Sequence, residues 1–134
     1  MKRMKHILLV DDEDEFLFSA AMALRIAGYV VSVANRVGEA LDRVRLSEES
    51  GCDVDLVVTD IQMDGMGGKE LIGTVNERWP DLPVFVITGS FDRNLTAELA
   101  THRCAGHILK PFNPGEFLER IERVLDNPGV VKPA

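Results

Sequence analysis

The sequence has few cysteines, which limits the kinds of site it can form. Only two, Cys52 and Cys104, occur among 134 residues, and their separation fits no metal-binding motif. A cysteine-ligated metal site is therefore not expected. Both cysteines adjoin apolar segments, where a free thiol usually packs as a small hydrophobic group; redox sensing is the alternative.

Long apolar runs and clusters of basic residues are also missing. The first apolar run, residues 7–10, stops at Asp11 and is too short for a signal peptide or a membrane span. The net charge is −7 and no segment collects the lysines and arginines of a nucleic-acid footprint. We expect a cytoplasmic protein that binds neither membrane nor nucleic acid directly.

The sequence does contain a regular alternation of short apolar runs and longer segments of helical period. The predicted strands are 6–10, 29–33, 54–59, 84–88 and 106–109, and the predicted helices are 14–27, 36–48, 66–78, 92–102 and 113–126. This (βα)₅ pattern predicts an α/β fold in three layers, with a parallel sheet between helices. The length fits one domain, which we assign to residues 1–127, and we assign 128–134 to a tail or the start of a linker.

Polar residues stand where four of the five predicted strands end. Asp11 and Asp12 follow the first strand, Asp60 follows the third, Thr88 closes the fourth and Lys110 follows the fifth. In doubly wound sheets the functional loops lie at the carboxyl ends of the strands. Three carboxylates in one cleft repel each other unless a cation lies among them, and oxygen ligands select a hard ion such as Mg²⁺.

The same residues suit phosphoryl transfer. A carboxylate such as Asp60 can act as a nucleophile and form an acyl phosphate, while Thr88 and Lys110 hold the phosphoryl oxygens. Taken singly, an Asp after a strand can be a helix cap, a Thr a strand residue and a Lys a solvated charge. All five at successive strand ends favour the chemical interpretation.

Four segments resemble the signature blocks of response regulator receiver domains: LLVDDE at 8–13, TDIQM at 59–63, ITGS at 87–90 and LKPF at 109–112. The resemblance covers roughly residues 5–126. It implies a flavodoxin-like sheet of order 2-1-3-4-5. It also implies Asp60 as phosphoacceptor, Asp12 and the Gln62 carbonyl as further Mg²⁺ ligands, Asp11 acting through water, and a cis peptide between Lys110 and Pro111.

The resemblance also implies the partners. A sensor histidine kinase or a histidine phosphotransfer domain would donate the phosphoryl group, and a downstream protein or effector domain would respond, with phosphorylation-dependent dimerisation as one form of response. The chain would catalyse only its own phosphorylation and dephosphorylation. Whether it stands alone or comes from a longer regulator or a hybrid kinase stays open.

Several positions depart from the family pattern or tune it. Asp64 replaces the usual proline, either as a helix cap or as an extra charge near the metal. His107 replaces the usual Tyr or Phe, either as a tolerated ring or as a pH-sensitive switch. Gln62 and Ser90 stand where receivers control the access of water to the phosphoryl group.

The first predicted helix carries more apolar residues than a core face needs. Leu17, Phe18, Ala21 and Met22 fall outside the expected core stripe. We interpret them as a patch for the phosphodonor, with additional core contacts as the alternative.

Three other functions compete with this interpretation. A haloacid-dehalogenase-like phosphatase usually needs an Asp where Gln62 stands, as its general acid. A nucleotide or flavin site needs a glycine-rich first turn, whereas residues 11–15 are acidic. A scaffold receiver that is never phosphorylated is the third, although the complete five-residue set disfavours it.

Overall fold

The computed structural model describes residues 4–61, 67–89, 102–126 and 132–133. Five strands form a parallel sheet in the order β2-β1-β3-β4-β6, with β6 as the fifth strand of the predicted order 2-1-3-4-5. Their bounds are β1 His6–Val10, β2 Val30–Ala34, β3 Leu56–Asp60, β4 Val84–Thr88 and β6 Gly106–Leu109. The predicted fold class and strand order are confirmed.

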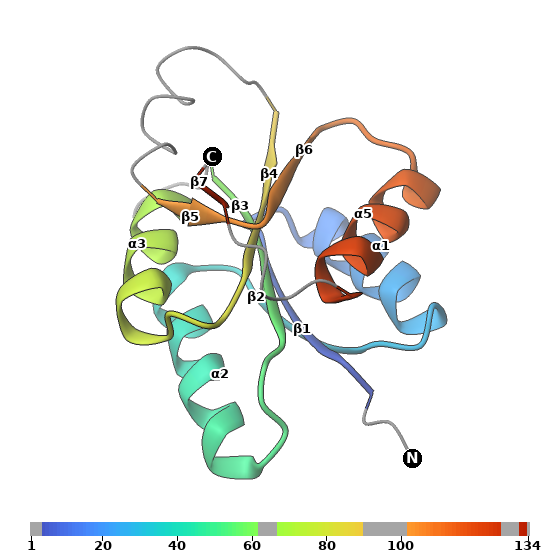
Figure 1. Cartoon of the computed structure of the whole chain (residues 1–134). Coiled ribbons are helices and arrows are strands. Elements are labelled where there is room, and N and C mark those ends of the chain that lie inside the picture. The colour runs from blue at the N-terminus through green and yellow to red at the C-terminus, as the bar shows by residue number, and fades with distance from the viewer. Residues whose placement is uncertain (1–3, 62–66, 90–101, 127–131, 134) are drawn as a thin grey trace.

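Helices cover both faces of this sheet. They are α1 Asp14–Ile26, α2 Val37–Ser50, α3 Gly68–Arg78 and α5 Pro114–Asp126. Figure 1 shows α2 and α3 on one side of the sheet, and α1 and α5 on the other. The predicted helix 92–102 lies almost wholly outside the described residues. Within the described part of the chain, no helix is long and apolar enough to cross a membrane.

The strands are buried on both faces, and alternate residues join two separate cores. In β1, Leu8 and Val10 pack with α2 and α3, whereas Ile7 and Leu9 pack with α1 and α5. Continuous apolar strands are typical of parallel sheets between two helical layers. The sheet is therefore a rigid platform for whatever its strand ends carry.

Predicted and observed elements differ mainly at their ends. β2 begins one residue later than predicted. β3 begins two residues later and ends one residue later than predicted, so that Asp60 is its last residue. Two short strands, β5 Arg103–Cys104 and β7 Lys132–Pro133, were not predicted and pair antiparallel. β7 lies within residues 128–134, which the sequence assigns to a tail or the start of a linker.

The orientation of α1 corrects the predicted docking patch. Leu17 and Ala21 are buried in the core, so their assignment to an exposed patch is wrong. Phe18 and Met22 are exposed as predicted, at 68% and 46%, and Ile26 one turn further on is 82% exposed. Apolar residues occur around nearly the whole helix, so periodicity alone did not determine which side faces the sheet.

The two cysteines and Trp79 lie away from the strand ends that carry the polar residues. Cys104 is buried, and this burial raises the pKa of its thiol to about 11, which agrees with a packing role. Cys52 is partly exposed. The Trp79 indole, just after α3, donates a 2.5 Å hydrogen bond to Glu48 of α2. Trp79 thereby joins these two helices near the amino ends of the strands.

Candidate functional site

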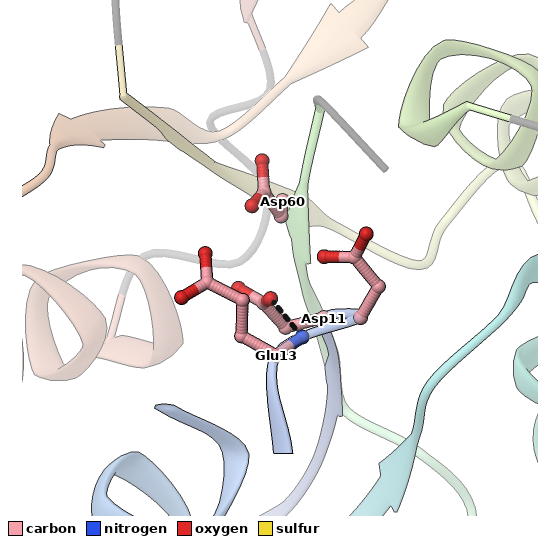
Figure 2. Close-up of side chains that lie close together, drawn as sticks. Asp11, Glu13 and Asp60 are labelled. Carbon is pink, nitrogen blue, oxygen red and sulfur yellow. Dashed lines mark hydrogen bonds between the residues drawn. The ribbon is translucent and has the colours of Figure 1, made fainter. Parts of the chain in front are cut away.

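The carboxyl ends of the central strands bring four acidic side chains together. Asp11, Asp12 and Glu13 follow β1, and Asp60 ends the neighbouring strand β3. One carboxylate oxygen from each of the four lies within 4.8 Å of the others. Figure 2 shows Asp11, Glu13 and Asp60 around one common space. Asp11 is fully buried, Asp60 nearly so, and the other two are exposed.

Lys110 enters this cluster from the loop after β6. Its Nζ lies 2.8 Å from Asp11 Oδ2, 3.1 Å from Asp60 Oδ2 and 3.4 Å from Glu13 Oε1. The same atom lies 4.2 Å from the centroid of the Phe16 ring. The ammonium group is thus held between three carboxylates and an aromatic face, with 19% of the side chain exposed.

Burial and charge act in opposite directions on these groups. Burial raises the pKa of Asp11 and the nearby Asp60 adds to this, while Lys110 and the Glu13 backbone N–H oppose it without cancelling it. Burial alone would lower the pKa of Lys110, but its hydrogen bonds to Asp11 and Asp60 outweigh burial and raise it. Lys110 is therefore protonated at neutral pH, one ammonium group among four carboxyl groups.

Thr88 completes the predicted set at the end of β4. The residue is fully buried, and its backbone carbonyl accepts a 2.8 Å hydrogen bond from the Lys110 N–H. This bond joins β4 to the segment that carries the lysine. The Lys110–Pro111 peptide is cis, as the resemblance implied. The structure thus brings Asp11, Asp12, Asp60 and Lys110 together and places Thr88 at the end of the strand beside Asp60.

A glycine lets α3 begin directly against the end of β3. The Gly68 N–H donates to the Ile61 carbonyl, and a Cβ at Gly68 would collide with the carbonyl oxygen of Asp60 and lie 2.7 Å from Ile61 Cα. Both contacts are with backbone, which cannot rotate away. Only glycine fits this approach without displacing the segment that carries Asp60.

Gly68→Ala is expected to destabilise the domain by about 1–3 kcal/mol, because the added methyl group overpacks against backbone. Gly38→Ala is the matched control, since Gly38 lies in α2 with open space around its missing Cβ. There the change is expected to be neutral or stabilising by less than about 1 kcal/mol. Urea unfolding of both variants measures the difference, and equal stabilities would contradict the close approach.

Two residues at the site were not predicted from the sequence. Glu13 is a fourth carboxylate of the cluster and a partner of Lys110. Phe16 contacts Lys110 with its ring. The acidic run after the first strand gave a signal for Glu13, but nothing in the sequence distinguished Phe16 from the core residues of α1.

Other predicted positions are either outside the described residues or differently placed. Gln62 and Ser90 lie outside them, as does Asp64. The N-cap position of α3 is Gly67. Both interpretations of Asp64 therefore stay predictions. His107 lies on β6 and is exposed overall. Desolvation where its ring meets the protein, and then the charge of the Arg120 guanidinium, lower its pKa below the usual 6.5.

The donor set at the strand ends fits a hard divalent cation. All four side chains offer carboxylate oxygens, without sulfur or imidazole, and two of them are exposed. Oxygen ligands of this kind suit Mg²⁺ or Ca²⁺. The acidic cluster can therefore hold a metal ion beside Asp60.

The comparisons with known proteins agree with this geometry. A sequence model described as the response regulator receiver domain matches residues 7–122. The chain is 32% identical over 124 residues to the sensor kinase CckA of Brucella abortus, a match that covers 90% of this chain and 12% of that protein. It is 30% identical over 120 residues to the C4-dicarboxylate transport transcriptional regulatory protein DctD of Pseudomonas aeruginosa, covering 90% and 25%.

Solved structures give the same result. A CheY-like receiver domain protein from Methanospirillum hungatei matches with a TM-score of 0.85 and 28% identity, covering 95% of this chain and 98% of that one. The chemotaxis protein CheY4 of Vibrio cholerae matches with a TM-score of 0.83 and 27% identity, covering 91% and 99%. The chain spans a quarter or less of the two curated relatives above, but nearly the whole of these structures. The chain therefore belongs to the response regulator receiver domain family of two-component signal transduction.

Proposed function

We propose that Asp60 accepts a phosphoryl group in a Mg²⁺-dependent reaction and that this changes the binding of a partner. The observation that supports it best is the bonding of the Lys110 ammonium group to both Asp60 and Asp11 at the carboxyl ends of β3 and β1. An acidic cluster with a fixed ammonium group suits the transfer of a negatively charged group onto a carboxylate.

In this proposal, Asp60 Oδ attacks the phosphorus of a phosphohistidine on a sensor kinase or a histidine phosphotransfer domain. A P–O bond forms as the P–N bond breaks, and the electron pair returns to the donor imidazole. Lys110 pairs with one phosphoryl oxygen and the Thr88 hydroxyl donates to another. Mg²⁺, held by Asp12, Asp60 and the Gln62 carbonyl with Asp11 acting through water, would supply charge neutralisation.

Incubation of the chain with acetyl phosphate, which is a small phosphodonor, tests the proposal. With Mg²⁺, intact-mass measurement is expected to show the gain of one phosphoryl group, and EDTA should prevent it. Turnover of unrelated phosphate esters is not expected, because the domain would catalyse only its own phosphorylation and dephosphorylation. No gain under any condition would favour a scaffold receiver.

The exposed apolar stripe of α1 is proposed as the docking site for the phosphodonor. Phe18, Met22 and Ile26 recur every four residues, so they line one face of the helix. The same helix carries Phe16, which contacts Lys110 at the site. Clustered exposed apolar side chains of this kind usually mark a protein-binding surface.

Phe18→Asp is expected to slow phosphotransfer from the donor protein about tenfold or more, because it places a charge in an apolar contact. Phosphorylation by acetyl phosphate and the free energy of unfolding should hardly change, since Phe18 is exposed. Ser19→Asp is the matched control, with the same added charge on an exposed neighbour. Equal slowing by both variants would contradict the docking site and indicate simple charge repulsion.

A further inference from the structure

We propose that Phe16 is a positioning residue for Lys110, holding the ammonium group where a phosphoryl group on Asp60 needs it. The inference rests on the proposed phosphorylation of Asp60. It concerns a contact between α1 and the loop after β6 that no signature block of the sequence contains.

The first observation is the position of the amine over the Phe16 ring, 4.2 Å from its centroid. A cation at this distance is attracted by the negative face of the ring. The ring accepts no conventional hydrogen bond, so the N–H groups of Lys110 stay available for oxygen atoms. Phe16 therefore restrains the amine without competing with Asp11 or Asp60.

The second observation is that the ring is itself held in place by the segment that carries the lysine. Phe16 meets Phe112 edge to face, with centroids 5.8 Å apart. Phe112 stacks on Phe117 of α5 at 4.9 Å, and Phe117 contacts Phe85 of β4 at 6.4 Å. The positioning ring is thus the outermost member of an aromatic series that reaches the fully buried core. Its orientation is fixed by packing on the sheet.

The third observation concerns Glu13, the partner of Lys110 that a phosphoryl oxygen can replace. The contact of Lys110 with Glu13 is the longest of its three carboxylate contacts, at 3.4 Å, and the Glu13 side chain is 67% exposed. A phosphoryl oxygen can replace this weak, solvent-facing partner. The ring of Phe16 and the carboxylate of Asp11 would keep the amine in place during that exchange.

Three variants and two readouts test the proposal: Phe16→Leu, Phe16→Tyr and the control Leu46→Ala. Phe16→Leu keeps an apolar side chain but removes the π face, and is expected to slow phosphorylation by acetyl phosphate about three- to tenfold. Phe16→Tyr keeps the face and should stay within about twofold of the wild type. Leu46→Ala truncates an exposed apolar side chain on α2, outside the site, and should have no effect.

The second readout is the proton NMR shift of the Lys110 ε-methylene group, assigned by comparison with Lys110→Met. The ring current should move this signal upfield in the wild type and in Phe16→Tyr, and the displacement should disappear in Phe16→Leu. This readout needs no phosphorylation and depends on the distance between the amine and the ring. If the wild type gains no phosphoryl group, the proposed function fails, while the shift still decides whether the ring holds the amine.

Three results would overturn the proposal. One is a wild-type phosphorylation rate in Phe16→Leu. Another is equal slowing in Phe16→Leu and Phe16→Tyr, which would indicate that only the shape of the side chain matters. The third is the absence of an upfield ε-methylene signal from the wild type.

Discussion

Asp60→Asn is expected to abolish phosphoryl uptake from acetyl phosphate, leaving the intact mass unchanged under conditions in which the wild type gains one phosphoryl group. The amide of Asn is not a nucleophile, so no acyl phosphate can form there. The other buried carboxylate, Asp11, is fully enclosed and bonded to Lys110, which leaves it poorly placed to substitute. We therefore expect a loss of uptake to below detection rather than a reduction.

The control for this variant is Asp42→Asn, which removes one carboxylate from the exposed surface of α2. It should gain the phosphoryl group at the wild-type rate. If Asp60→Asn still gains a phosphoryl group, another residue is the acceptor. Asp12 and Glu13 are then the exposed candidates in the same cluster.

Lys110→Met is expected to destabilise the domain by about 2–4 kcal/mol at neutral pH, because it leaves the buried carboxylates of Asp11 and Asp60 without their cation. The value lies below that for a wholly buried pair because the lysine side chain keeps 19% exposure. Arg45→Met, which also removes one positive charge but from an exposed pair, should change the free energy of unfolding by less than about 1 kcal/mol. Denaturant unfolding of the two variants measures the contrast.

The conditions that should restore stability to the Lys110→Met variant follow from the same charges. Millimolar Mg²⁺ should recover part of the loss, because it replaces the missing cation and binds only the folded cluster. Low pH should also recover part of the lost stability. Asp11 has a raised pKa in the folded chain, which therefore binds its proton more readily than the unfolded chain as the pH falls. If neither Mg²⁺ nor low pH reduces the difference in the free energy of unfolding between Lys110→Met and the wild type, the lost stability does not arise from uncompensated charge.

The pKa of Lys110 determines the alkaline pH at which the wild type loses the stabilisation from this pairing. Because its folded pKa is raised above 10.5, its pairing stabilises the fold completely below that pH. The contribution is lost only as the pH rises above 10.5 and through the raised value. The pairing therefore stays intact throughout the neutral range.

The location of the site could be predicted from the sequence, because the carboxyl ends of parallel strands meet at one edge of a sheet. Once the alternation of strands and helices is recognised, Asp11, Asp60, Thr88 and Lys110 must fall on the same edge. Shifts of one or two residues in β2 and β3 do not alter this, since they leave the order of the ends unchanged. The acidic cluster and its lysine therefore follow from topology and residue type.

The α1 surface could not be predicted in the same way. Periodicity needs polar residues on one side of a helix, and α1 has apolar residues around most of its circumference. Tertiary packing decided that Leu17 and Ala21 face the core while Phe18 and Met22 face outward. The pairing of β5 with β7 was missed for another reason: strands of two residues have no periodicity to detect.

The place of Trp79 gives this domain a separate optical reporter for its folding. It is the single tryptophan in the sequence, and its hydrogen bond to Glu48 joins α2 to the end of α3. The acidic cluster lies at the other ends of the strands. Tryptophan emission should consequently record whether these two helices are docked while remaining nearly silent to metal or phosphoryl binding at Asp60, so the two equilibria can be followed independently in one sample.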